Sequence, residues 1–148
     1  MISLWSMSGT VFAVIFGVYM LFRATVLEKW GVAAILFGWF ATPFVQQGYE
    51  LGVLGKLLDV FVLVVLLGVS VKVRRVWTLL VCSFQLATTL SHVVVALANW
   101  NSSENIGYWA YFTTMGLLGG KGIALAMGIG AWEAAFWRKQ PLTPAITI

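Results

Sequence analysis

The chain has 148 residues, of which 61% are hydrophobic and only 9% are charged, and its mean hydropathy is +0.94. Soluble domains carry about 25% charged residues, so this composition excludes a water-soluble fold and predicts one integral membrane domain over residues 1–148. The net charge of +4 then concerns orientation in a membrane, and we expect lipids and no nucleic acid as partners.

Five apolar stretches follow one another along the chain, each near the roughly 20 residues that a helix needs to cross a hydrocarbon core. Their connections are short, which favours antiparallel packing of successive helices in an all-α bundle. The fifth stretch is longer than a bilayer requires, so it must tilt, kink or extend beyond the membrane. The predicted spans are residues 2–22, 30–46, 53–71, 76–98 and 108–137.

Lysine and arginine gather at one end of the predicted bundle. With five spans, the turns after the first and third spans share a side with the C-terminal tail, and the loops of the opposite side hold no Lys or Arg. Because cytoplasmic loops are enriched in these residues, we predict an external N-terminus, a cytoplasmic C-terminus and a multi-pass location in a bacterial inner membrane. The cationic residues concerned are Arg23, Lys29, Lys72, Arg74, Arg75, Arg138 and Lys139.

Aromatic residues near both ends of the spans are typical of the belts that mark membrane boundaries. Glu133 lies near the inner boundary, and we expect its side chain to reach water there. The predicted outer belt holds Trp5, Trp100, Tyr108 and Trp109, and the inner belt holds Trp30, Trp77, Trp132 and Trp137.

The fourth span carries a polar stripe. At 100° per residue its polar side chains fall within one sector of about 100°, so we expect this face to point into the bundle. Two interpretations stay open for the stripe: hydrogen bonding between helices, or a polar lining for a ligand or proton path. Its members are Thr78, Gln85, Thr88, Thr89, His92 and Asn99.

Charged residues inside the spans predict an internal polar cluster of Asp59, Gln85, His92 and Lys121, because an unpaired charge in lipid is costly. Asp59 and His92 fall at comparable depths on antiparallel helices, so Asp59 could pair with His92 or with Lys121. Alternatively, Lys56 and Lys121 extend to water and Asp59 stays near the surface.

The sequence contains no recognisable metal-binding motif. Cys82 is the single cysteine and His92 the single histidine, which exclude an internal disulfide, a cysteine metal cage and a bis-histidine haem within the chain. We predict no metal site and no intrinsic cofactor, although a lipid, quinone or pigment could bind at an interface. Catalytic motifs are also lacking, and the chain is predicted not to be an enzyme.

The segment "GLLGGKGIALAMGIG", residues 116–130, is rich in small residues. It lacks the first Gly and the final Ser or Thr of a phosphate-binding loop. Its spacing instead predicts two close-packing rows on the fifth helix, of which one could face a different protein. One row is Gly116, Gly120, Ala124 and Gly128, and the other is Gly122, Ala126 and Gly130.

The second half of the chain resembles a family of small, uncharacterised inner-membrane proteins of alphaproteobacteria. The resemblance rests on Trp77, Phe84-Gln85-Leu86, His92, Trp109-Ala110-Tyr111 and Gly130-Ala131-Trp132. It departs from the pattern at Thr78, where proline is usual. The resemblance implies a bacterial inner-membrane protein with five spans and implies no activity.

Two functions compete on this sequence. The short loops, the close-packing rows and the lack of catalytic motifs favour a non-catalytic accessory or assembly subunit, with other integral membrane subunits as partners, for example in a respiratory or photosynthetic complex. The alternative is a small transporter, channel or ligand-binding membrane protein that uses the internal polar cluster.

Overall fold

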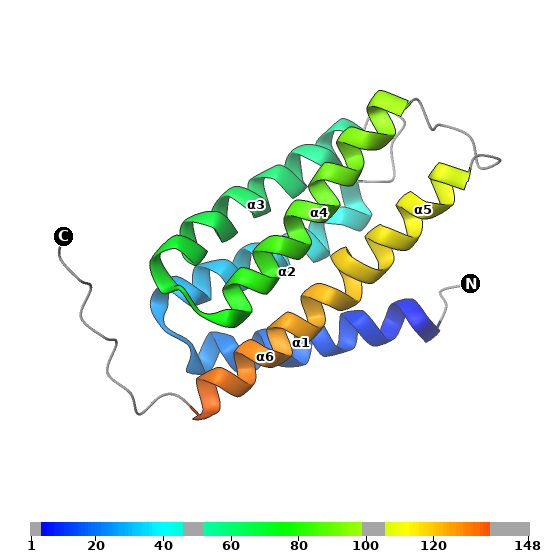
Figure 1. The fold of residues 1–148 in the computed structure, drawn as a ribbon. Helices are drawn as coiled ribbons and strands as arrows, with labels where there is room; N and C mark the ends of the chain where they lie inside the picture. Colours follow the sequence, from blue (N-terminus) through cyan, green and yellow to red (C-terminus); the bar gives the residue numbers. More distant parts are fainter. Residues whose placement is uncertain (1–3, 46–51, 99–105, 137–148) are drawn as a thin grey trace, which may run out of the picture.

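The computed structural model describes residues 4–45, 52–98 and 106–136, and every element in these ranges is helical (Figure 1). The all-α prediction is therefore confirmed for this part of the chain. The predicted residues Asn99, Trp100, Trp137, Arg138 and Lys139, and the side chains of Trp5, Tyr108 and Trp109, lie outside the described parts. The elements are α1 (Leu4–Arg23), α2 (Val26–Val45), α3 (Gly52–Val73), α4 (Val76–Ala98), α5 (Ile106–Thr114), a π-helix η1 (Met115–Gly122) and α6 (Ile123–Phe136).

Three segments are long and apolar enough to cross a membrane: Leu54–Val73, Val76–Val95 and Met115–Phe136. A shorter apolar helix covers Gly9–Arg23. Large hydrophobic residues of the bundle point outward. Phe37, Val64 and Leu125 are examples, and each is more than half exposed. Such surface suits a lipid environment, so the coarse prediction of a membrane-type helical bundle is confirmed.

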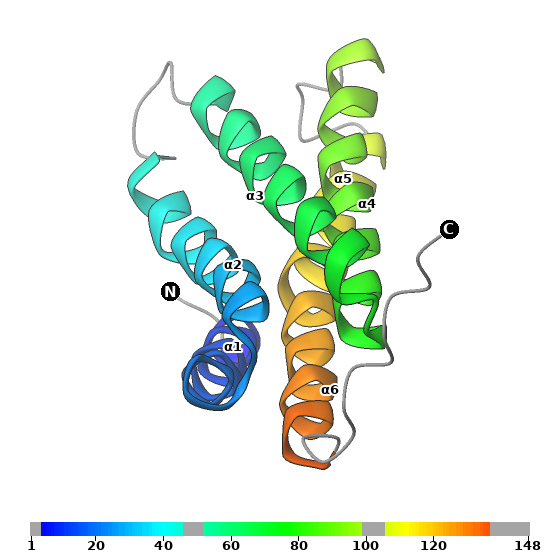
Figure 2. The same ribbon diagram turned by 90° about the vertical axis from the view of Figure 1, so that its left-hand side faces the viewer.

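The helices form a ring in the order α1, α2, α3, α4 and α6, in which α6 packs back against α1 (Figure 2). Successive helices are neighbours, as the short connections predicted. The fully buried side chains Met20, Leu66, Trp77 and Met127 come from four different helices and fill the centre of this ring. At the end of the bundle that holds α5, this helix packs mainly against α4. The ring is therefore open at that end.

The last helical segment runs without a break from α5 through η1 to α6, along the whole bundle (Figure 1). In its middle the hydrogen bonds widen: the Ile123 N–H is bonded to the carbonyl of Leu118, five residues earlier, and to that of Gly120. Glycine weakens the regular α-helix, and this stretch is the glycine-rich one. Wide turns of this kind are rare and occur frequently at functional sites.

The second helix begins at Val26, four residues before the predicted span, because the Glu28 side chain reaches back to Thr25 and forms one half of a capping box. Glu28 Oε2 accepts hydrogen bonds from the Thr25 backbone N–H at 2.9 Å and from the Thr25 hydroxyl at 2.7 Å. The T-x-x-E spacing of Thr25 and Glu28 in the sequence is typical of a helix start. Sequence reasoning placed these residues in a loop, so that boundary was wrong.

Glu28 also ties α2 to α4 at the end of the bundle where the α1–α2 and α3–α4 turns lie. Its Oε1 accepts from the Trp77 indole N–H at 3.0 Å and lies 3.2 Å from Arg75 Nη1. Glu28 and Trp77 are both fully buried. Trp77 lies at the end of a span, where it was predicted, but its side chain packs inside the bundle, whereas the belt residues Trp30 and Trp132 are more than half exposed.

Glu133 from α6 belongs to the same region and does not extend to water. It is only 9% exposed, and its Oε2 has no hydrogen-bond partner among the described residues. Arg75 and Glu28 are its charged neighbours. The expected position at the water boundary is wrong because α6 turns this side chain toward α4 and the preceding turn, where the partly exposed Arg75 compensates part of its charge. We call Thr25, Glu28, Arg75, Trp77 and Glu133 the Glu28 network.

The small-residue rows of the last helix pack against other helices of this chain along α6 and at Gly122. Gly130 lies against Met20 and Trp77, Gly122 against Phe84, and Gly128 against Phe16. Ala124 and Ala126 are buried. Gly116 and Gly120, which meet no neighbouring side chain, line a cavity in the open end of the ring.

Candidate functional site

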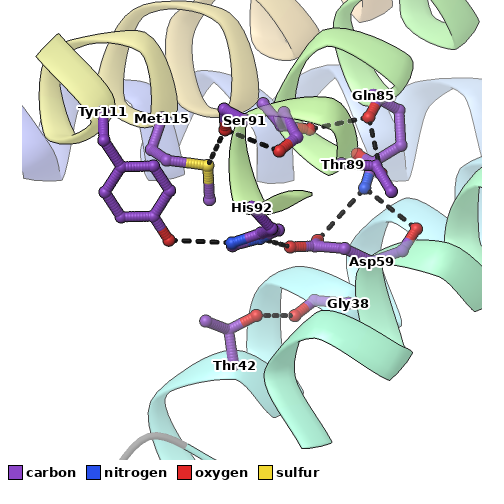
Figure 3. Close-up of polar contacts among 10 residues, drawn as sticks. Gly38, Thr42, Asp59, Gln85, Thr89, Ser91, His92, Tyr111 and Met115 are labelled. Atoms are coloured by element: carbon purple, nitrogen blue, oxygen red, sulfur yellow. Dashed lines mark hydrogen bonds and ion pairs between the residues drawn. The ribbon is translucent and has the colours of Figure 1, made fainter. Parts of the chain in front are cut away.

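Asp59 on α3 forms the centre of a polar cluster between α3 and α4 (Figure 3). Its Oδ2 lies 2.7 Å from His92 Nε2, and its Oδ1 accepts from Gln85 Nε2 at 3.1 Å. Gln85 Nε2 also approaches the Asp59 backbone carbonyl at 3.2 Å. Residues 85 and 92 share one face of α4 because they are two helical turns apart. The structure thus brings Asp59, Gln85 and His92 together, and Asp59 pairs with His92.

Tyr111 on α5 extends this cluster and was missed by sequence reasoning. Its hydroxyl oxygen lies 2.8 Å from His92 Nδ1, on the side of the ring opposite Asp59 (Figure 3). The sequence placed it among the aromatic residues of a helix start, and nothing there distinguishes it from its neighbours. Only the packing of α5 on α4 brings the phenol to the imidazole. Asp59, His92 and Tyr111 form a continuous hydrogen-bonded chain, which we call the Asp59 relay.

Hydroxyl groups of α4 hold the Gln85 end of the cluster in place. The Thr88 and Thr89 hydroxyls each donate to the backbone carbonyl of Gln85 at 2.8 Å. Ser91 donates to the Thr88 carbonyl at 2.7 Å and contacts Met115 Sδ at 3.6 Å. These bonds satisfy the hydroxyls locally, so they do not compete for the Asp59 carboxylate.

The polar stripe of α4 faces the bundle interior as predicted. Thr78, Gln85 and Thr88 are at most 4% exposed, whereas Leu79 and Leu90 on the opposite side are more than half exposed. The stripe makes hydrogen bonds between helices, because Gln85 and His92 on α4 both contact Asp59 on α3. Gln85, Thr88 and His92 also line a cavity.

The cavity has a volume of about 520 Å³ and opens at the end where α5 diverges from the ring. Asp59, Gln85, His92, Tyr111 and Lys121 all contribute to its wall. Lys121 comes from η1, and its side-chain stem passes close to Gly9 on α1. The fourth member of the predicted cluster therefore shares the cavity with the other three, while the Asp59 carboxylate is held by His92 and Gln85.

The rest of the wall combines polar side chains, namely Thr10, Thr42, Lys56 and Thr88, with apolar side chains and bare backbone. Ile35, Trp39, Val62 and Ile123 supply the apolar surface. Gly116 and Gly120 leave room that a larger side chain would occupy, since a Cβ atom at either position meets no other side chain. The described residues contain no cluster of three or more metal-binding side chains. The arrangement can exchange a proton and can hold a small molecule that has polar and apolar parts.

The proton positions in the Asp59 relay follow from donor and acceptor chemistry. A carboxylate only accepts, so a neutral His92 must carry its proton on Nε2, and Nδ1 then accepts from the Tyr111 hydroxyl. If His92 is protonated, both ring nitrogens donate, and His92 and Asp59 form an ion pair. The His92 and Asp59 side chains are 11% and 27% exposed, so a proton can reach them from the cavity.

We expect neutral His92 to be the Nε2–H tautomer. Because the chain has a single histidine, nitrogen-15 NMR of histidine-labelled protein gives one pair of ring signals. Asp59→Asn should mix the two tautomers, since an amide both donates and accepts. Ser83→Ala is the matched control on α4, because Ser83 is exposed and donates only to the Leu79 carbonyl. A wild-type Nδ1–H tautomer would mean that Asp59 carries the proton.

Comparison of this chain with protein-family models, with curated proteins and with solved structures finds no significant match.

Proposed function

We propose that this protein binds a small molecule in the cavity beside the Asp59 relay, as a ligand-binding or transport protein of the membrane. The observation that carries the proposal is the shared cavity wall of Asp59, His92, Tyr111 and Lys121. Ionisable side chains in membrane helices are costly and by default mark a substrate or ion path. The volume of about 520 Å³ lies within the roughly 300–1,000 Å³ typical of small-molecule sites.

The membrane placement that accompanies this proposal has five spans, with the N-terminus outside and the C-terminus in the cytoplasm of a bacterial inner membrane. The support is the distribution of charge. Arg23, Lys29, Lys72, Arg74 and Arg75 lie around the α1–α2 and α3–α4 turns, at one end of the bundle. In this orientation the cavity opens toward the outer side, because it lies at the opposite end from those turns.

An accessory subunit was the first hypothesis from the sequence, and it relied on the lack of catalytic motifs, the short loops and the small-residue rows. Gly122, Gly128 and Gly130 approach Phe84, Phe16 and Trp77 of the same chain. This part of the rows supports packing within the bundle and gives no support for a partner. The proposed binding function is non-catalytic. The proposed ligand is a lipid, a quinone or another amphipathic molecule.

Filling the cavity tests this function. Gly120→Leu should remove the bound molecule without unfolding the protein, because a Cβ atom at Gly120 meets no other side chain and the residue lines the cavity. The measurement is native mass spectrometry of protein released from a gentle detergent or lipid nanodiscs. Wild type should carry a discrete small-molecule adduct that Gly120→Leu lacks. Gly68→Leu, on α3 where a side chain also meets open space, should retain it. Identical adduct patterns in all three proteins, or none, would count against the cavity.

A further inference from the structure

We infer that the cavity takes an amphipathic monocarboxylate together with one proton, and that the proton is held on His92. This inference deepens the proposed function and rests on it. It follows from the direction of hydrogen bonds in the Asp59 relay, from the charges around the cavity and from its apolar wall.

Protonation of His92 reverses the role of Tyr111. With a neutral ring, Nδ1 accepts from the phenol, whose only proton is then directed at the imidazole. With an imidazolium ring, Nδ1 donates to the phenol oxygen across the same 2.8 Å contact, and the phenol proton must turn elsewhere. Tyr111 lines the cavity, so its hydroxyl becomes a donor toward a molecule bound there. Uptake of the proton and binding of a hydrogen-bond acceptor are thereby linked.

The charges of the wall favour a negative ligand. Around His92, α3 brings Asp59 and Lys56, α5 brings Tyr111 and η1 brings Lys121. From α1 and α2 the lining residues are not titratable, Thr10 and Trp39 among them. Among the described residues that line the cavity, two lysines accompany one carboxylate, and His92 adds a further positive charge when it is protonated. An anion stabilises that form, and the same coupling makes the protonated protein bind the anion more tightly.

The shape of the wall favours a ligand with one charged end. The titratable groups of the wall come from α3, α4, α5 and η1, whereas α1 and α2 contribute only uncharged side chains, including the apolar Ile35 and Trp39 of α2. A ligand charged at both ends would bury one charge against these side chains at high cost. A carboxylate on an aromatic or alkyl body satisfies both parts. Its oxygens would accept from Tyr111 and lie near Lys121, and its body would contact Trp39.

Benzoate and benzyl alcohol are matched probes, because they share an aromatic ring and differ in charge. Each is titrated into histidine-labelled protein in nanodiscs at a pH where His92 is neutral, and the His92 ring nitrogens are observed. Benzoate should convert both nitrogens to the imidazolium form, and benzyl alcohol should shift the signals without converting them. The benzoate affinity should fall about tenfold for each unit by which the pH rises, as one linked proton requires.

Variants separate this inference from the function on which it rests. Tyr111→Phe should abolish the conversion by benzoate while benzyl alcohol still shifts the signals, and Gly120→Leu should abolish both effects. If both probes shift His92 and neither protonates it, the proton linkage is wrong and the binding function stands. If neither probe shifts His92 in wild type, both proposals fail. Ser83→Ala should behave as wild type.

Discussion

Glu28→Ala is expected to cause one of the two largest losses of stability in this protein, about 3–5 kcal/mol in the free energy of unfolding. Glu28 is fully buried, and its two oxygens accept from Thr25, Trp77 and Arg75. Removing the carboxylate leaves the Arg75 charge and the Trp77 N–H without their acceptor, and it removes half of the capping box. Thermal or chemical unfolding in detergent, followed by circular dichroism, measures the loss.

Two further variants define the origin of that loss. Glu28→Gln keeps one acceptor oxygen and the side-chain volume, so it should lose clearly less stability than Glu28→Ala. Lys29→Ala changes the neighbouring charge outside the Glu28 network and should change the unfolding free energy by less than about 0.5 kcal/mol. Equal losses for Glu28→Ala and Lys29→Ala would show that the network contributes nothing specific.

Gly130→Ala is expected to cost about 1–2 kcal/mol, although alanine is the better helix former by about 1 kcal/mol. A Cβ atom at Gly130 would stand 2.8 Å from Met20 Cε and 2.8 Å from the indole carbons Cγ and Cδ2 of Trp77. The methionine end can move. The indole cannot move freely, because it is fully buried and its N–H is bonded to Glu28.

The matched control for this substitution is Gly68→Ala on α3. A Cβ atom there meets nothing within 4 Å, so only the gain in helix propensity remains, about 0.5–1 kcal/mol. Unfolding of both variants in the same detergent should therefore give changes of opposite sign. A stabilised Gly130→Ala protein would contradict the close approach of α6 to α4.

The two polar regions of the bundle differ in how their carboxylates are used. In the Glu28 network, four donors occupy the oxygens of Glu28, and the group joins helices. In the Asp59 relay the carboxylate holds a histidine whose far side meets a phenol on the cavity wall. A fully satisfied buried group rigidifies a fold, whereas a chain of exchangeable protons at a cavity can respond to a ligand.

Sequence reasoning located three members of the cavity cluster on the correct faces because helical periodicity is local. The spacing of Gln85 and His92 fixes their common face on α4, and the short turn after α3 fixes the depth of Asp59 beside them. The same reasoning did not predict the burial of Trp77 and Glu133, because their positions near a span end suited exposed side chains. Their burial depends on contacts between helices, as the bond from the Trp77 indole to Glu28 on α2 shows.

The sequence alone determined the membrane-type composition, the helical class, the order of the helices and the polar face of α4. These features follow from the share of apolar residues and from a period of 3.6 residues. Tertiary structure alone decided that α5 brings Tyr111 to His92, that Asp59 pairs with His92, and that Gly122, Gly128 and Gly130 pack within the chain. It also decided where the cavity forms, since α5, η1 and α6 are one continuous helix whose η1 and α6 parts pack against α1 while α5 packs against α4. Such contacts join residues far apart in the chain, and no local pattern encodes which partner each residue meets.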